Sequence, residues 1–146
     1  MSPFEDSDLT EEAIHEHYTA HLTNGLGNLV ARVMQLAETH LLEPIKQPEA
    51  LAFPQEYRDM INAFEFNRAM DWVWNRIQSL DERITREEPF KLVKKDVENG
   101  RALIRELVTE LYQIGRFLNP FMPKTNEIIK KTVLENKKPK NLFPRI

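Results

Sequence analysis

Hydrophobic residues recur every three or four positions along most of the chain, which is the spacing of one face of an α-helix. We see no convincing alternation of the kind that predicts strands. The pattern predicts an all-α bundle of about five helices, over about residues 10–42, 55–63, 67–88, 97–118 and 125–135. The side chains expected to face the core are Leu26, Leu29, Val33, Leu36, Met70, Val73, Ile77, Leu80, Ile84, Leu103, Leu107, Leu111, Ile114, Leu118, Ile128, Ile129 and Val133.

Prolines separate these segments. Pro44, Pro48 and Pro54 make residues 43–54 a connection, and Asn119-Pro120 ends the fourth helix. Pro89 must lie beyond the end of the third helix, because proline disfavours helical geometry in the residue before it. A short helical turn is expected around residues 91–96.

The length of 146 residues fits a single domain, residues 1–146. We expect residues 1–8 to be a lead-in and residues 137–146 to be a basic tail. The tail carries the apolar pair Leu142-Phe143, so we expect part of it to dock back on the bundle. 

The absence of cysteine excludes disulfides, zinc sites with thiolate ligands and cysteine nucleophiles. No apolar run approaches the roughly 20 residues of a membrane span, and the N-terminus has no apolar signal region. We therefore expect a cytoplasmic protein without a membrane partner.

Charge is distributed unevenly along the chain. Residues 1–20 hold acidic side chains and no lysine or arginine, whereas residues 124–146 are strongly basic. This layout permits a nucleic-acid partner at the basic end, and an ordinary solvated tail explains it equally well.

No motif indicates a catalytic or metal site. His15, His17 and His21 do not match the H-E-x-x-H arrangement and have no evident third ligand, so a polar helix face is the favoured interpretation. Carboxylates occur in runs, and no glycine-rich phosphate loop or nucleophile motif is present. We predict no catalytic residue, no metal and no small-molecule substrate for this chain.

One polar face of the first helix suggests recognition of nucleic acid. Asn28, Arg32, Gln35 and Thr39 follow helical spacing beside the leucine stripe. Asparagine and arginine are the side chains that hydrogen-bond base edges. Considered alone, this is a weak signal, because a polar face is what the solvent side of an amphipathic helix normally shows, and that interpretation is favoured.

A second feature is the segment "EEPFKLVKK". Phe90 follows Pro89 and lies close to Lys91, Lys94 and Lys95, so it could form a stacking platform for an unpaired base. The alternative is that Phe90 fills a gap in the core at a corner of the chain.

Two tryptophans lie on the third helix. We expect Trp74 in the core, and Trp72 either packed against another helix or at the boundary with solvent. An exposed Trp72 would be another candidate for base stacking.

Taken together, four stretches resemble one family. "TAHLTNGLGNLVARVM", "FNRAMDWVWNRIQSLDERITREEPFKLVKK", "LNPFMPKTNEII" and "LFPRI" are similar, in the same order, to segments of the anticodon-binding domain of methionyl-tRNA synthetases. The resemblance covers roughly residues 3–146 and implies a helical domain that binds the CAU anticodon loop of tRNA(Met).

The resemblance implies roles for particular residues. Asn28 and Arg32 match the polar pair that hydrogen-bonds anticodon bases, and Phe90, preceded by Pro89, matches the aromatic on which the first anticodon base stacks. That aromatic is normally tryptophan, so phenylalanine is a departure that keeps stacking and loses the N–H donor. A second departure is Arg83, where the family usually has an aromatic, and Asp81 stands in for the family's asparagine.

Further expectations complete this hypothesis. Lys94, Arg86 and Lys91 would neutralise RNA phosphates.

The resemblance also implies what this chain lacks. Methionyl-tRNA synthetases carry a Rossmann-type catalytic domain that uses ATP and magnesium, with a zinc-binding insertion in many members. None of its motifs occurs here, so we expect no cofactor in this chain. We expect a non-catalytic piece of a methionine-tRNA ligase whose partners are tRNA and the catalytic domain.

Two alternatives remain open at this point. The chain could be a helical protein-interaction module without RNA binding. It could also be the equivalent domain of another class I synthetase, against which the Leu-Gly-Asn-Leu stretch and the "LFPRI" ending argue.

Overall fold

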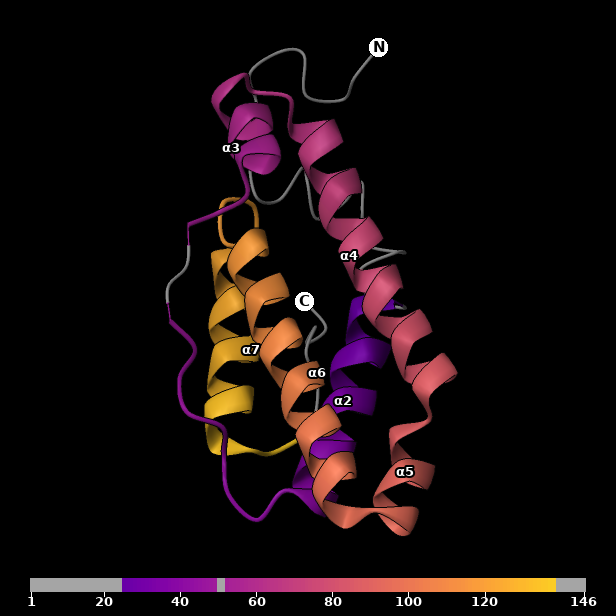
Figure 1. Ribbon diagram of the computed structural model, residues 1–146. Helices are drawn as coiled ribbons and strands as arrows, with labels where there is room; N and C mark the ends of the chain where they lie inside the picture. The colour runs from indigo at the N-terminus through magenta and orange to yellow at the C-terminus, as the bar shows by residue number, and fades with distance from the viewer. Residues whose placement is uncertain (1–24, 50–51, 139–146) are drawn as a thin grey trace.

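The computed structural model describes residues 25–49 and 52–138, which form six α-helices and no strand (Figure 1). This arrangement confirms the predicted all-α bundle. The helices are α2 (Gly27–His40), α3 (Gln55–Asn62), α4 (Phe66–Glu87), α5 (Pro89–Lys95), α6 (Val97–Leu118) and α7 (Pro123–Glu135).

Helix α6 is the central element, because it packs against α2, α4, α5 and α7. The five residues expected to face the core from this helix are all buried. So are the five expected from α4, and Ile129 and Val133 of α7. The three-to-four spacing therefore identified the inward faces of the long helices correctly.

The segment between α4 and α6 differs from expectation in one detail. Helix α5 begins at Pro89, two residues before the expected start, and Glu88 adopts a left-handed conformation with φ of 45°. A left-handed residue ends α4 and redirects the chain, and proline is favoured in the first turn of the new helix. Phe90 consequently lies in the first turn of a helix rather than in a loop.

The first predicted helix is covered only in part. Within α2, Leu29 and Val33 are fully buried, while Leu36 is partly buried against the core. The expectations for residues 1–24, including the three histidines, and for Leu142-Phe143 of the tail fall outside the described residues.

The expectation that Trp74 is the core tryptophan is wrong. Trp72 is the buried one: its ring stacks on Tyr57, with centroids 4.7 Å apart, and meets Phe117 edge-on. Trp74 is only partly buried. The expectation that Trp72 packs against another helix is confirmed, because Tyr57 of α3 covers a second face of α4.

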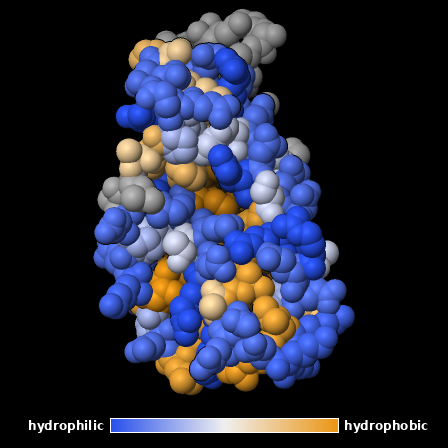
Figure 2. All heavy atoms as spheres, in the orientation of Figure 1, coloured by the Kyte–Doolittle hydropathy of each residue, from blue (hydrophilic) through white to orange (hydrophobic). Residues whose placement is uncertain are grey.

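Hydrophilic residues cover most of one face of the molecule (Figure 2). Hydrophobic residues reach the surface mainly in the lower half of that view, where α5 and α6 meet (Figures 1 and 2). Within residues 25–49 and 52–138, no helix has both the length and the apolar character that a membrane span requires.

Candidate nucleic-acid interface

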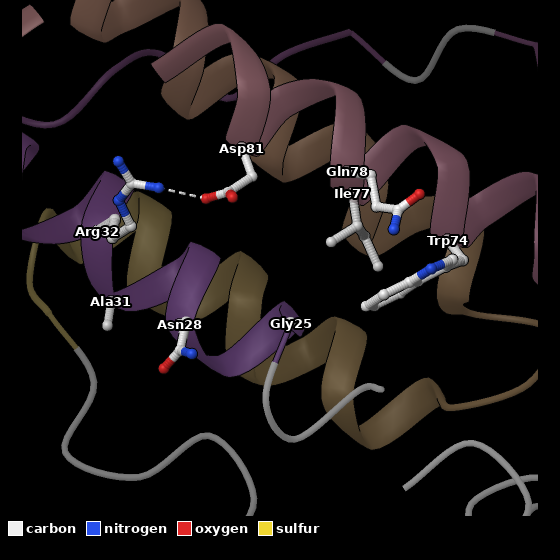
Figure 3. A pocket seen from close by; sticks show the side chains of 8 residues that line it. All are labelled: Gly25, Asn28, Ala31, Arg32, Trp74, Ile77, Gln78 and Asp81. Atoms are coloured by element: carbon white, nitrogen blue, oxygen red, sulfur yellow. Dashed lines mark hydrogen bonds and ion pairs between the residues drawn. The ribbon is translucent and has the colours of Figure 1, made fainter. Parts of the chain in front are cut away.

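A pocket of about 610 Å³ lies between α2 and α4 (Figure 3). It contains both residues that the sequence singled out on the first helix, Asn28 and Arg32. The remaining lining residues come from residues 25–31 and from the facing side of α4: Gly25, Ala31, Trp74, Ile77, Gln78 and Asp81.

Arg32 points across this pocket to Asp81, and the two side chains form an ion pair (Figure 3). The distance from Nη1 to Oδ1 is 2.5 Å, and the side chains are 43% and 48% exposed. Ion pairs with this much exposure contribute about 0–1 kcal/mol to stability. The pair therefore adds little to the stability of the fold. Its main effect is on the charge and the orientation of the two side chains in the pocket.

Asn28 lies one helical turn before Arg32. It is exposed, makes no hydrogen bond to another described residue, and points away from the ion pair in this view (Figure 3). The same polar face continues with Gln35, whose amide donates to the Thr39 hydroxyl at 3.1 Å. Within this face, the side chain of Asn28 is thus available for contacts with a ligand.

One end of the pocket is formed by Trp74, whose ring lies against Gly25 (Figure 3). A Cβ atom at Gly25 would lie 2.3 Å from Cη2 of Trp74, which is closer than real Cβ contacts. The missing side chain therefore allows the indole to lie against the start of α2. This contact gives a physical reason for one of the two glycines in the "GLGN" stretch.

Helix α5 presents the other predicted features. Phe90 is 47% exposed, so it does not fill a gap in the core. The ammonium group of Lys91 lies 5.9 Å from the Phe90 ring centroid and also pairs with Glu88 at 2.8 Å. Lys94, one turn after Phe90, is exposed on the same side of the helix.

Pro89 is buried, unlike its neighbour Phe90. It therefore offers little surface to a ligand, and its role is to start α5 and thereby place Phe90 in the first turn.

Phe90 is not among the residues that line the Arg32 pocket. Helix α4 continues from Asp81 to Glu87 before the chain turns into α5, a rise of about 9 Å along the axis. Helix α5 also contacts α2 directly. The two predicted features thus lie on neighbouring elements, about two helical turns apart.

Arg86 lies elsewhere. It lines a groove between α4 and α6, together with Arg76 and Arg83, and does not line the pocket that contains Arg32. This placement separates Arg86 from the other basic residues grouped with it in the sequence analysis.

Arg83, in the same groove, is neutralised by acidic neighbours. Its guanidinium pairs with Glu87 at 2.5 Å, with Glu110 at 2.6 Å and with Glu106 at 3.6 Å. Burial lowers the pKa of Arg83, but the hydrogen bond to Glu87 and the attraction of the glutamates outweigh burial, so its pKa lies above the ordinary value. Because three carboxylates surround it, Arg83 connects α4 to α6 and leaves little net charge for a phosphate.

No cluster of three or more histidine or acidic side chains that could hold a metal ion occurs in the part of the chain that the structure describes.

Sequence reasoning did not assign the α4 members of the pocket to a site. Trp74 and Gln78 lie one turn apart on α4 and share the side of Ile77 that faces α2. The helical spacing of Trp74, Gln78 and Asp81 is visible in the sequence. To recognise these residues as one side of a pocket, however, one would have to know that α2 packs against this side of α4.

Comparisons with known proteins identify what this chain is similar to. It is 30% identical to a methionine–tRNA ligase of Helicobacter pylori, over 84% of this chain and 21% of that protein. It is 27% identical to the methionine–tRNA ligases of Caldanaerobacter subterraneus and Fusobacterium nucleatum, over 82% and 85% of this chain. The chain spans only about a fifth of the length of each relative.

The resemblance found in the sequence motifs is thus confirmed. No protein-family model and no solved structure matches the chain significantly.

Proposed function

Because this chain is similar along most of its length to one segment of methionine–tRNA ligases, we propose that it is an anticodon-recognition domain. Its ligand is the CAU anticodon loop of tRNA(Met), bound on behalf of a catalytic domain that performs aminoacylation with ATP in the cytoplasm. The chain itself supplies recognition and no chemistry.

One observation carries this proposal: Asn28 and Arg32 lie in a single open pocket between two packed helices. Recognition of unpaired RNA needs planar donors and acceptors that hydrogen-bond the edges of splayed bases. Both helices belong to one hydrophobic core, so these groups are held on a rigid support.

Phe90 and the lysines of α5 support the same function. An exposed aromatic ring offers a base a stacking surface, and stacking contributes about 1–3 kcal/mol per base. Lys94 is exposed, forms no ion pair with another described residue, and would neutralise a backbone phosphate. Lys91 and Arg86 contribute less specifically, since Lys91 already pairs with Glu88 and Arg86 lies across α4.

A protein-interaction module is the alternative function. Its support would be exposed apolar surface, and the structure offers Leu42, 86% exposed, and Phe64, 77% exposed. They lie in separate connections, after α2 and between α3 and α4. Single exposed apolar residues are common on monomeric proteins, so they favour this alternative only weakly.

The test is a binding titration with two RNA hairpins, one with the CAU anticodon and one whose first anticodon base is changed to U. We expect the chain to bind the CAU hairpin more tightly at physiological salt. Arg32→Ala should reduce the difference between the hairpins, because it removes a base-edge donor. Equal affinity of the unaltered chain for both hairpins would exclude base recognition at this surface.

Lys94→Ala is the matched control. It should weaken binding to both hairpins alike and lower the salt slope by about 1, since a phosphate contact carries no sequence information.

A further inference from the structure

Trp74 presents an aromatic ring to the pocket between α2 and α4. Its indole projects from α4 toward the start of α2 (Figure 3). Unlike Trp72, which is buried against Tyr57 of α3, Trp74 is only partly buried, although Val73 beside it is fully buried. Packing in the core therefore does not account for the whole indole, and part of its surface lines the pocket.

The indole is held in place by the absence of a side chain at Gly25. A Cβ atom there would lie 2.3 Å from Cη2 and 2.5 Å from Cζ3 of Trp74, so the outer edge of the six-membered ring rests on the backbone at this position. An aromatic ring that is already positioned loses little conformational freedom when a ligand binds, which favours stacking.

Gln78 lies one helical turn after Trp74, on the same side of α4 (Figure 3). It is exposed and makes no hydrogen bond to another described residue. Its amide presents a donor and an acceptor in one plane, which is the arrangement that complements N7 and the N6 amino group of adenine. This end of the pocket thus combines an aromatic surface with a group that hydrogen-bonds the edge of a base.

Trp74 and Phe90 are too far apart to contact the same base. The part of α4 from Trp74 to Glu87 spans about 20 Å along the axis, and α5 lies beyond its end (Figure 1). The motif resemblance implies that Phe90 stacks on the first anticodon base, so a base that contacts Trp74 is a later one. Adenine occurs once in CAU, at the second position.

We propose that Trp74 is a second stacking residue of the interface: the adenine of the CAU anticodon stacks on its indole, and Gln78 hydrogen-bonds the edge of that base. Phe90 holds a different base. This inference rests on the proposed function, and it adds two residues that determine specificity at the second anticodon position.

The first test uses the fluorescence of the two tryptophans of the chain. A base that stacks on an indole quenches its fluorescence, so a saturating CAU hairpin should quench the emission of the unaltered chain. In Trp74→Phe the remaining tryptophan is the buried Trp72, so the quenching should be lost. The hairpin should still bind within about twofold, because phenylalanine keeps a stacking surface. Quenching that persists in Trp74→Phe would overturn the inference.

The second test uses hairpins that lack one anticodon base. Trp74→Leu should weaken binding of the CAU hairpin by about fivefold or more, the lower end of what one base–aromatic stack contributes. The loss should disappear with a hairpin that is abasic at the second position, because no adenine is then present to stack. Equal losses with both hairpins would show that Trp74 supports the fold rather than a base, and the inference would be wrong.

Phe90→Leu is the matched control. Its loss of affinity should disappear with a hairpin that is abasic at the first position and persist with the hairpin that is abasic at the second. If Trp74→Leu and Phe90→Leu both couple to the same position, the two rings do not hold different bases and the inference fails.

Gln78→Ala tests recognition of the base edge. It should reduce the preference for adenine over uracil at the second position by about fivefold or more, because it removes the paired donor and acceptor. Asn75→Ala is its control, since Asn75 is an exposed amide of α4 that does not line the pocket. Equal effects of the two variants would overturn the role of Gln78.

Failure of the inference is distinguishable from failure of the proposed function. If the unaltered chain does not discriminate between the CAU hairpin and the hairpin with a changed first base, the proposed function fails. If it discriminates and the effect of Trp74→Leu does not depend on the second base, only the role of Trp74 fails.

Discussion

The phenol of Tyr57 lies in an aromatic cluster at the junction of α3, α4 and α6. The residue is fully buried, its ring stacks on Trp72, and its hydroxyl donates a hydrogen bond to the backbone carbonyl of Phe117. Burial disfavours the charged phenolate and raises the pKa of Tyr57 well above its ordinary value. The folded protein therefore retains this proton at a pH where the unfolded chain has lost it.

Tyr57 makes stability sensitive to alkali. Above about pH 10 the unfolded chain releases the Tyr57 proton and the folded chain does not, so the free energy of unfolding should fall as pH rises. Tyr57→Phe should cost about 1 kcal/mol at pH 7, where it loses the hydrogen bond to Phe117. Urea unfolding at several pH values should show this difference shrinking above pH 10; a constant difference would contradict the prediction.

For the residues of the pocket, the sequence shows the type and spacing of a side chain but not which distant side chain it meets. Arg32 was identifiable as a candidate because its residue type and helical spacing are visible in the sequence. Its partner was not, because the acidic residues of α4 are numerous and only the packing of α2 on α4 places Asp81 opposite it.

At the scale of the helices, the position of Phe90 depends on how closely α5 approaches α6. Gly100 of α6 lies against the backbone of Val93, and a Cβ atom there would be 2.4 Å from the Val93 Cα. A clash with backbone cannot be relieved by a side-chain rotation. The absence of a side chain at Gly100 is therefore what allows α5 to pack here.

Gly100→Ala should displace α5 and with it Phe90. We expect a loss of about 1–3 kcal/mol in stability, the usual cost of overpacking, together with weaker binding of RNA hairpins. Gly115→Ala is the control within the same helix, because its Cβ would meet side-chain atoms of Asn126 and Ile129 at 3.1 and 3.2 Å, which can shift slightly. Thermal unfolding of the two variants should separate them; equal effects would show that the α5 contact is not critical.

The end of α2 is held by residues from distant elements. The Asn136 amide, at the end of α7, donates to the carbonyls of Ala37 and Leu41, at 3.3 Å each. Arg101 of α6 donates to the carbonyl of His40 at 3.0 Å. These contacts satisfy the carbonyls of His40 and Leu41, which the helix end leaves without a backbone partner, and they fix the helix that carries Arg32 relative to α6 and α7.

At the scale of the whole molecule, one hydrophobic core extends through α2, α3, α4, α6 and α7. Because no part of the described bundle has a separate core, we expect it to unfold in one cooperative transition. Urea unfolding followed by circular dichroism and by tryptophan fluorescence should give the same midpoint. The fluorescence reports on Trp72 beside α3 and Trp74 beside α2, so separate transitions would show that these regions unfold independently.

The sequence by itself determined the helical architecture, the approximate bounds of α4 and α6, their inward faces, and the position of Asn28 and Arg32 on a polar helix face. These properties are local, since a helix repeats every 3.6 residues and its hydrophobic face must be buried. The motifs also identified the similarity to methionine–tRNA ligases.

Only the tertiary structure decided which side chains from distant segments meet. It placed Asp81 against Arg32, Trp74 against Gly25, and Arg86 on the opposite side of α4 from the pocket. The physical reason is that each such contact depends on the rotation and approach of two helices. Those are set by the packing of the whole core, and no periodicity within a single segment encodes them.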